Sequence, residues 1–242
     1  MMEENMDGVL IGVGVGPGDP GSLTLKAIDA IKHADVLYIP HKDADKCRAF
    51  ATVKEAVPEA SEKEIVGCDF EMTPDPEERK ERRNRIYLTV KEKLEADKTV
   101  AFVTIGDPSI YSTFSYIADL AARDGKTVRV VSGISSPAEC AASLGISLCE
   151  GQQSLHVIPG PEGLPDALKL SGTKVVMKCP KDLTIVKESI RDHIRVSGHD
   201  LSVYAVTECG MPGEKQYRSL EEIPDKAGYL TTVIIKENKQ NE

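Results

Sequence analysis

Hydrophobic residues in the first half of the chain form short runs that are separated by segments of mixed polarity. The runs lie near 9–15, 36–39, 99–105 and 127–131. Their length and their β-branched residues predict buried strands. Apolar residues at helical spacing, such as Ile86, Val90 and Leu94, predict helices in between. These helices lie near 24–33, 76–96, 112–123 and 136–144. Strands that alternate with helices predict a parallel sheet covered on both faces.

The segment 40–75 is less regular than its surroundings. Within it, the residues from Lys63 to Cys68 are able to supply one more strand. The remainder is expected to form a loop.

A second group of elements begins beyond Gly151. Strands are predicted near 154–158, 173–178, 201–206 and 229–236. A single helix near 182–196 is predicted between the second and third of these strands. A second α/β domain with a mixed sheet is therefore expected. The boundary falls near Ser136, which gives an N-terminal domain over 1–136 and a C-terminal domain over 137–242.

The stretch 100–116 (VAFVTIGDPSIYSTFSY) holds the most informative loop in the chain. Its apolar run stops abruptly at Gly106, Asp107 and Pro108, and a helix is expected to follow. In open α/β sheets, ligands bind at the carboxyl ends of the strands. Gly106 allows close approach to the backbone, and Pro108 fixes the turn. The sequence therefore predicts a ligand site at this strand end.

A second glycine-rich loop follows the first predicted strand. Residues 16–21 (GPGDPG) formally match the dinucleotide pattern G-x-G-x-x-G. Pro17 and Pro20 lack the backbone N–H groups that a pyrophosphate needs, so the match is weak. A nicotinamide dehydrogenase remains an alternative, and tight NADH binding would favour it.

Composition narrows the class of protein. With 242 residues and 40% hydrophobic content, the chain can form one large domain or two small ones. No apolar run approaches the ~20 residues of a membrane span, and the acidic start MMEENMDG is unlike a signal peptide, so a cytoplasmic protein is expected. The net charge of −9 argues against nucleic-acid binding. Six cysteines without C-x-x-C or nearby histidines predict neither a metal site nor disulfides.

Three separated motifs together resemble the tetrapyrrole methylase family. They are GVGPGDP at 14–20, GDPSIY at 106–111, and VSGISS at 131–136 followed by AASLGI at 141–146. The resemblance extends along nearly the whole chain. It implies two α/β domains with a cofactor cleft between them, a homodimer, and S-adenosylmethionine as the cofactor, which leaves as S-adenosylhomocysteine.

Within the family, residues 104–117 (TIGDPSIYSTFSYI) resemble the branch that methylates C20 of precorrin-2 or cobalt-factor II in corrin synthesis. Uroporphyrinogen methylases typically have Gly-Gly-Asp-Pro followed by a Phe-Gly-Arg segment, which is missing here. The same fold could serve another corrin intermediate, uroporphyrinogen III, or a protein side chain as in diphthine synthases. A non-enzymatic cofactor sensor is a further alternative, which the intact glycine loops disfavour.

The resemblance also assigns site residues in the first part of the chain. Ile105, Gly106, Asp107 and Ile110 match positions that line the cofactor, and Asp107 is a candidate catalytic carboxylate. Its alternative role is to cap the following helix, and Ile110 is alternatively a core residue. Pro17 matches a position near cofactor and substrate.

Asp19 is the second candidate catalytic carboxylate, as a base or substrate contact; as a turn residue ahead of a helix it has an equally good structural role. Ser135 and Ser136 match a small pair that lies against the cofactor, although either can serve as a helix N-cap.

The remaining cofactor positions lie in the second half of the chain. Met177 matches an adenosine contact, and a core methionine is the alternative. Thr207 and Glu208 correspond to a further contact, although the family's usual Glu-Asn-Gly-Thr is not preserved here.

The substrate implied by the resemblance is a tetrapyrrole with several carboxylates, which calls for cationic partners. One basic cluster comprises Arg79, Lys80, Arg82, Arg83 and Arg85. Interleaved glutamates favour its interpretation as a solvated surface. His41, Lys42 and Arg48, beyond the end of a predicted strand, are better candidates for a substrate loop. Tyr111 and Tyr116 either flank the macrocycle or pack the helix. Cobalt, where present, belongs to the substrate.

Overall fold

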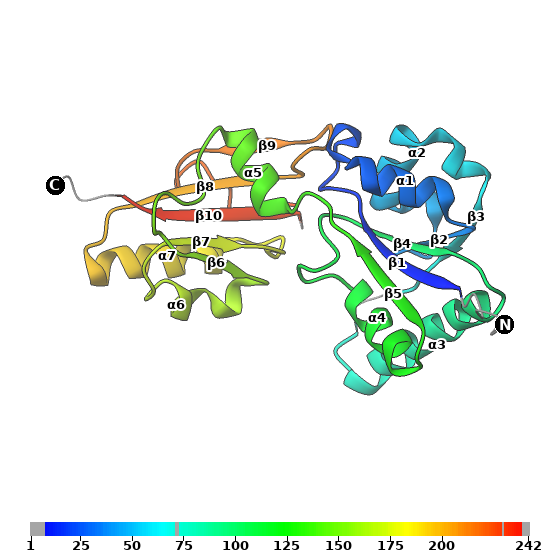
Figure 1. The fold of residues 1–242 in the computed structure, drawn as a ribbon. Helices are drawn as coiled ribbons and strands as arrows, with labels where there is room; N and C mark the ends of the chain where they lie inside the picture. Colours follow the sequence, from blue (N-terminus) through cyan, green and yellow to red (C-terminus); the bar gives the residue numbers. More distant parts are fainter. Residues whose placement is uncertain (1–7, 71–72, 229, 239–242) are drawn as a thin grey trace. The chain divides into compact units, whose positions relative to one another are not determined.

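A computed structural model describes residues 8–70, 73–228 and 230–238 (Figure 1). The chain divides into two compact units, Met1–Ser135 and Ser136–Glu242. Each unit has its own five-stranded sheet. The acidic start of the chain and Tyr229, where the sequence predicts the last strand to begin, lie outside the described residues.

The first unit is built on a parallel sheet with the strand order β3-β2-β4-β1-β5. All four strand pairs are parallel, as the sequence predicts. The strands are β1 (Val9–Gly14), β2 (Val36–Ile39), β3 (Glu64–Gly67), β4 (Val100–Thr104) and β5 (Thr127–Val131). The optional strand between Lys63 and Cys68 is therefore present as β3, at one edge of the sheet.

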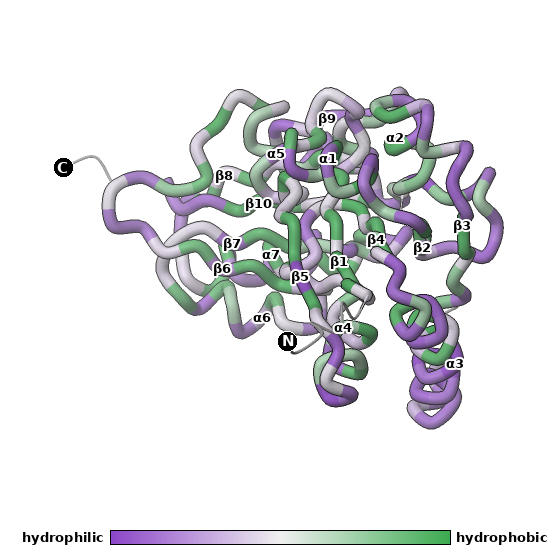
Figure 2. The backbone as a smooth tube through the Cα atoms, turned by 45° about the vertical axis from the view of Figure 1, so that its right-hand side comes forward, coloured by the Kyte–Doolittle hydropathy of each residue, from purple (hydrophilic) through white to green (hydrophobic). Residues whose placement is uncertain are grey.

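Helices cover both faces of this sheet. Alternate strand residues such as Leu37 and Val103 pack with α1 (Leu25–His33) and α2 (Arg48–Ala56). Their neighbours Tyr38 and Phe102 pack on the other face with α3 (Pro76–Glu95) and α4 (Phe114–Arg123). This alternation follows from the two-residue period of a strand. Figure 2 shows the apolar central strands and the largely hydrophilic α3.

Two details of this unit differ from the sequence prediction. The segment 40–75 contains helix α2, flanked by short 3-10 turns at Ala44–Lys46 and Pro58–Glu62. Helix α4 begins at Phe114 rather than at residue 112. The backbone of Tyr111 has a φ of +49°, which a right-handed helix does not allow, and the Ser112 hydroxyl accepts the Phe114 N–H at 3.2 Å. The turn after β4 is therefore longer than expected.

The second unit has a mixed sheet with the order β6-β7-β10-β8-β9. In the described part of this unit, only β6 and β7 pair in parallel and the other pairs are antiparallel, so the predicted mixed sheet is confirmed. The strands are β6 (Leu155–Ile158), β7 (Thr173–Val176), β8 (Leu201–Thr207), β9 (Lys215–Tyr217) and β10 (Thr231–Glu237). The sequence did not predict β9, because three largely solvent-facing residues leave no apolar pattern.

Three helices accompany this sheet. The predicted helix between the middle strands is α7 (Thr184–Ser197), which packs with the short α6 (Leu164–Ala167) against one face. Helix α5 (Ser136–Leu144) contacts β8 and β10. Lys174 of β7, only 1% exposed, pairs with Glu237 of β10 at 2.5 Å. A buried ion pair therefore links two neighbouring strands of the sheet.

Candidate functional site

The connections of β1 and β4 define a switch point at the carboxyl edge of the first sheet. These strands are neighbours in the centre of the sheet. The chain leaves β1 for α1 on one face and β4 for α4 on the other. Ligands of open α/β sheets bind at the carboxyl ends of the strands where the connections diverge to opposite faces in this way. The glycine-rich loops singled out in the sequence follow these two strands.

The two loops are hydrogen-bonded to each other. The Gly106 N–H donates to the Gly16 carbonyl at 2.8 Å, and the Gly16 N–H donates to the Gly106 carbonyl at 3.3 Å. Both glycines have left-handed backbones, with φ of +72° for Gly16 and +73° for Gly106. Other L-residues rarely adopt this conformation, so both positions favour glycine.

A third loop, which follows β5, packs against the other two. A Cβ placed on Gly14 would lie 2.5 Å from the Gly133 nitrogen and 2.6 Å from the Gly106 carbonyl oxygen. One placed on Gly133 would lie 2.7 Å from the Gly14 carbonyl carbon. No side chain fits at these separations. Glycine is therefore required at both positions by the packing of the loops on one another.

Asp107 ties the second loop to the third. Its side chain is buried, and Oδ2 accepts the Gly133 N–H at 3.0 Å. The other oxygen, Oδ1, accepts the N–H of Ser109 at 2.8 Å and also the Ser109 hydroxyl. Asp107 thus does not cap α4, which was its alternative role. It holds the loops at the strand ends together, and about one of its four lone-pair sites remains for a ligand.

The other first-unit candidates surround these loops. Pro17 is buried, and Asp19 is exposed with Oδ1 accepting the Gly21 N–H at 2.7 Å. Asp19 therefore has the turn role that the sequence offered, at the start of a 3-10 turn. Ile105 and Ile110 are partly exposed beside Asp107 in the chain.

Ser135 and Ser136 are also partly exposed, after Gly133. In the described part of the chain, neither of their hydroxyls makes a hydrogen bond within the protein. Their expected role as helix N-caps is therefore not seen, and both hydroxyls remain available to a ligand.

The second-unit candidates follow two strands that end at the same edge of their sheet. β7 and β8 both run antiparallel to β10, so their carboxyl ends lie together. Met177 follows β7 and is 8% exposed. Thr207 ends β8, and its hydroxyl is hydrogen-bonded to that of Thr231 at 2.9 Å. Glu208 comes next, with a φ of +53°.

Strained backbone marks this edge as well. Lys178 follows Met177 and has a φ of +51°, and desolvation lowers the pKa of its ammonium group. A left-handed L-residue costs about 1–2 kcal/mol. Such conformations cluster at functional sites. Sequence reasoning missed Lys178, Ser109 and Gly133, because backbone strain and long-range hydrogen bonds leave no local pattern.

The basic residues singled out in the sequence lie in two places, on α3 and from the loop after β2 to the start of α2. Arg82 is paired with Glu78 at 2.6 Å and with Asp69 at 3.3 Å, and Lys80 lies 3.7 Å from Glu77. For these the predicted solvated, ion-paired surface is correct. On the loop after β2, Nδ1 of His41 is hydrogen-bonded to the Asp43 backbone.

Among the described residues, no three His, Cys, Asp or Glu side chains form a metal site, and no helix is long and apolar enough to cross a membrane.

Known proteins match this chain in sequence and in fold. The family described as Tetrapyrrole (Corrin/Porphyrin) Methylases matches residues 9–224. The "Probable cobalt-precorrin-2 C(20)-methyltransferase" of Methanocaldococcus jannaschii is 38% identical over 169 residues, 69% of this chain and 70% of that protein. The "Cobalt-precorrin-2 C(20)-methyltransferase" of Salmonella typhimurium is 30% identical over 97% of this chain and 98% of its own length.

Solved structures share the two-domain α/β fold. The X-ray structure of a cobalt precorrin-4 methyltransferase has a TM-score of 0.73 at 19% identity and covers 94% of each chain. A uroporphyrin-III C-methyltransferase from Thermus thermophilus, complexed with S-adenosylhomocysteine, has a TM-score of 0.66 at 22% identity, with 95% of this chain and 97% of that one covered. The α/β fold expected from the sequence is confirmed. With its glycine loops joined at the switch point and its family match over most of its length, the chain belongs to the tetrapyrrole methylase family.

Proposed function

We propose that this chain is an S-adenosylmethionine-dependent methyltransferase that methylates C20 of precorrin-2 or its cobalt form in corrin synthesis. The observation that carries the proposal is similarity over nearly the full length to a relative named for that reaction on the cobalt-containing substrate. Such coverage includes both units, so the similarity is not confined to the cofactor motifs.

The carboxyl edge of the first sheet suits the cofactor chemically. The glycine loops bring bare backbone to the switch point, and Ile105 and Ile110 supply partly exposed apolar surface beside it. The hydroxyls of Ser135 and Ser136 are able to hydrogen-bond the charged amino-acid part of S-adenosylmethionine. We propose these residues, with Pro17, Gly106 and Asp107, as cofactor contacts; Met177, Thr207 and Glu208 are the proposed contacts in the second unit.

S-adenosylmethionine supplies an electrophilic methyl group on a sulfonium. The protein's task is then to bind and orient, because a correctly placed pair of reactants needs no protein nucleophile. Asp107 keeps the loops in place through Gly133 and Ser109. Asp19 is exposed beside the same loops, and we propose it as an acceptor for the proton that C20 loses when the methyl group is attached.

The test is an anaerobic methyl-transfer assay read by mass spectrometry. Precorrin-2, cobalt-factor II and uroporphyrinogen III are each incubated with S-adenosylmethionine. One added methyl at C20 of either of the first two supports the proposal. Methylation of uroporphyrinogen III alone would move the chain to another branch of the family. Binding of S-adenosylhomocysteine without methylation of any of these substrates would agree with the family assignment but would contradict the proposed substrate.

We also infer that the enzyme is a cytoplasmic homodimer, in keeping with its family. Light scattering coupled to size-exclusion chromatography tests the dimer, and a single species at the mass of one chain would contradict it. Cell fractionation tests the compartment.

A further inference from the structure

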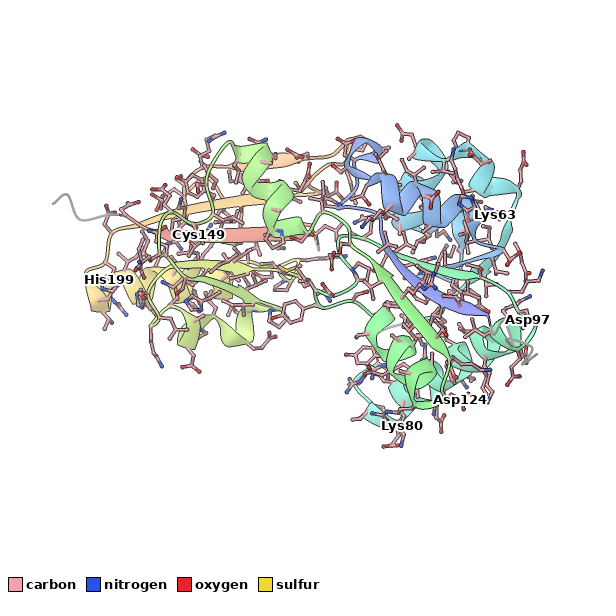
Figure 3. All side chains as sticks on the ribbon, viewed as in Figure 1. Lys63, Lys80, Asp97, Asp124, Cys149 and His199 are labelled. Carbon is pink, nitrogen blue, oxygen red and sulfur yellow. The ribbon has the colours of Figure 1, made fainter. Side chains whose placement is uncertain are left out.

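Helices α3 and α4 run side by side in the same direction. The Tyr87 hydroxyl of α3 donates to Asp124 at the end of α4 at 2.7 Å, and Lys91 pairs with the same carboxylate at 2.8 Å. Earlier in α3, Arg83 contacts Tyr116 in the first turn of α4. The seven residues of α3 before Arg83 span about 10 Å at 1.5 Å per residue. The first turns of α3 therefore extend beyond the contact with Tyr116, and Figure 3 labels Lys80 among them.

Arg83 lies over the aromatic ring of Tyr116. Its Cζ lies 3.4 Å from the centroid of the Tyr116 ring, within the range of a cation–π contact. Tyr116 is itself 42% exposed, and Arg83 is partly buried. A guanidinium placed over a ring is restricted in its motion and keeps N–H groups free for hydrogen bonds. A planar, oriented guanidinium binds a carboxylate through two parallel hydrogen bonds.

Charge balance and burial together distinguish Arg83 from its neighbours on α3: among the described residues Arg85 likewise forms no ion pair, but it is exposed. Arg82 and Lys80 have glutamate partners, and the guanidinium of Arg79 donates to the Thr73 carbonyl at 2.9 Å. Within 8–70, 73–228 and 230–238, Arg83 has neither an acidic partner nor a hydrogen bond. A partly buried cation without a counter-ion carries an uncompensated desolvation penalty. An anionic ligand would remove that penalty.

We infer that Arg83, stacked on Tyr116, is a specificity-determining site for one peripheral carboxylate of the tetrapyrrole. The identity of this ligand rests on the proposed function. The location rests on the fold: α4 begins directly after the loop of Gly106 and Asp107, so its first turn adjoins the switch point. The solvated-surface interpretation, correct for Arg82 and Lys80, does not hold for Arg83.

The experiment compares Arg83→Gln with the unaltered enzyme. We expect KM for the tetrapyrrole to rise about tenfold or more, because a charge-assisted pair of hydrogen bonds is lost. The Kd of S-adenosylhomocysteine is expected to stay the same. Arg83→Lys keeps the charge without the planar fork and should fall between the two. Tyr116→Leu removes the stacking surface and should raise KM by a smaller factor.

The matched control is Arg123→Gln, which removes the same charge from the last turn of α4. It should leave KM unchanged, so a rise there as large as for Arg83→Gln would show a general field effect and overturn the inference. If the unaltered enzyme methylates the tetrapyrrole and Arg83→Gln has an unchanged KM, the inference is also overturned.

Failure of the proposed function is separable from failure of this site. If the unaltered enzyme methylates none of the substrates, fluorescence titration with uroporphyrin, a stable polycarboxylate tetrapyrrole, replaces the assay. Weaker uroporphyrin binding by Arg83→Gln than by Arg123→Gln and the unaltered enzyme then supports the carboxylate site. Equal binding by all three, or no binding by any, overturns it.

Discussion

At the scale of single residues, Asp107 joins two of the three loops at the carboxyl edge of the first sheet. It accepts three hydrogen bonds, one of them from the Gly133 N–H, 26 residues away in the chain. Replacement by alanine leaves that partly buried N–H without its acceptor, which loosens two of the three loops.

For Asp107→Ala we expect about tenfold weaker binding of S-adenosylhomocysteine or a comparable loss of turnover, from the loss of a charge-assisted contact. Isothermal titration and the methyl-transfer assay measure the two quantities. Asp119→Ala, which removes an exposed carboxylate from α4, is the control and should change neither. Normal affinity and normal turnover in Asp107→Ala would exclude Asp107 from the site.

Gly133 makes a separate prediction, since its Cβ would overlap the backbone of Gly14. Gly133→Ala should destabilise the protein by about 1–3 kcal/mol through overpacking and weaken S-adenosylhomocysteine binding at least tenfold. Gly125→Ala is the control. Gly125 has a φ of +72° with no atom near its Cβ position, so alanine there costs about 1–2 kcal/mol of backbone strain.

Urea denaturation and calorimetric titration separate the two glycine variants. Both should lose stability, but only Gly133→Ala should lose cofactor affinity. Equal affinities in the two variants would contradict the packing argument.

At the scale of secondary-structure elements, the ion pair between β7 and β10 is asymmetric. Lys174 is 1% exposed and Glu237 28%. Burial alone would raise the pKa of Glu237, but the hydrogen bonds from Lys174 and from the Gly172 N–H hold it below the ordinary value of 4.5. The carboxylate is therefore charged at neutral pH and balances a buried ammonium group.

We expect Glu237→Gln to cost about 3 kcal/mol of unfolding free energy, because it leaves the buried Lys174 unpaired. Lys174→Met should cost less, because the carboxylate that remains is partly exposed and meets water. Urea denaturation gives both values, with Glu221→Gln on the surface as a control. A larger loss of unfolding free energy in Lys174→Met than in Glu237→Gln would show that the buried, unpaired lysine is not the main cost.

At the scale of the whole molecule, low-pKa carboxylates occur in both units. The pKa of Asp124 is lowered by hydrogen bonds from Lys91 and Tyr87. Burial would raise the pKa of Glu214, but hydrogen bonds from Gln216, Ser143 and the Gly210 N–H lower it. Others with a lowered pKa are Asp43, Glu59, Glu78, Asp166, Asp182 and Glu237.

Each of these carboxyls binds protons more readily when the chain is unfolded, at the ordinary values of 3.8 for Asp and 4.5 for Glu. Their stabilising contribution is complete above those values and is lost as pH falls through the lower folded values. Burial lowers the pKa of His193 below its ordinary value of 6.5, so the unfolded chain takes up a proton there first, and we expect a small fall of the urea midpoint between pH 7 and pH 5. A larger fall is expected below about pH 4.5, where the carboxyls of the unfolded chain become protonated. A midpoint that stays constant down to pH 3 would contradict this.

The sequence by itself determined most strands and helices of both units, because apolar runs and helical spacing act within a few residues of chain. It also determined the motifs that mark the family. It did not predict β9 and α6, which are only three and four residues long. It also did not predict α2, although Phe50 and Val53 bury one face of that helix, because the surrounding segment was interpreted as a loop. Only the tertiary structure decided what the polar residues do. Asp107 finds its partner 26 residues away, and Arg82 and Arg83 are neighbours on one helix that meet different groups. Contacts between elements depend on how the helices pack on the sheet, and no local pattern encodes that packing.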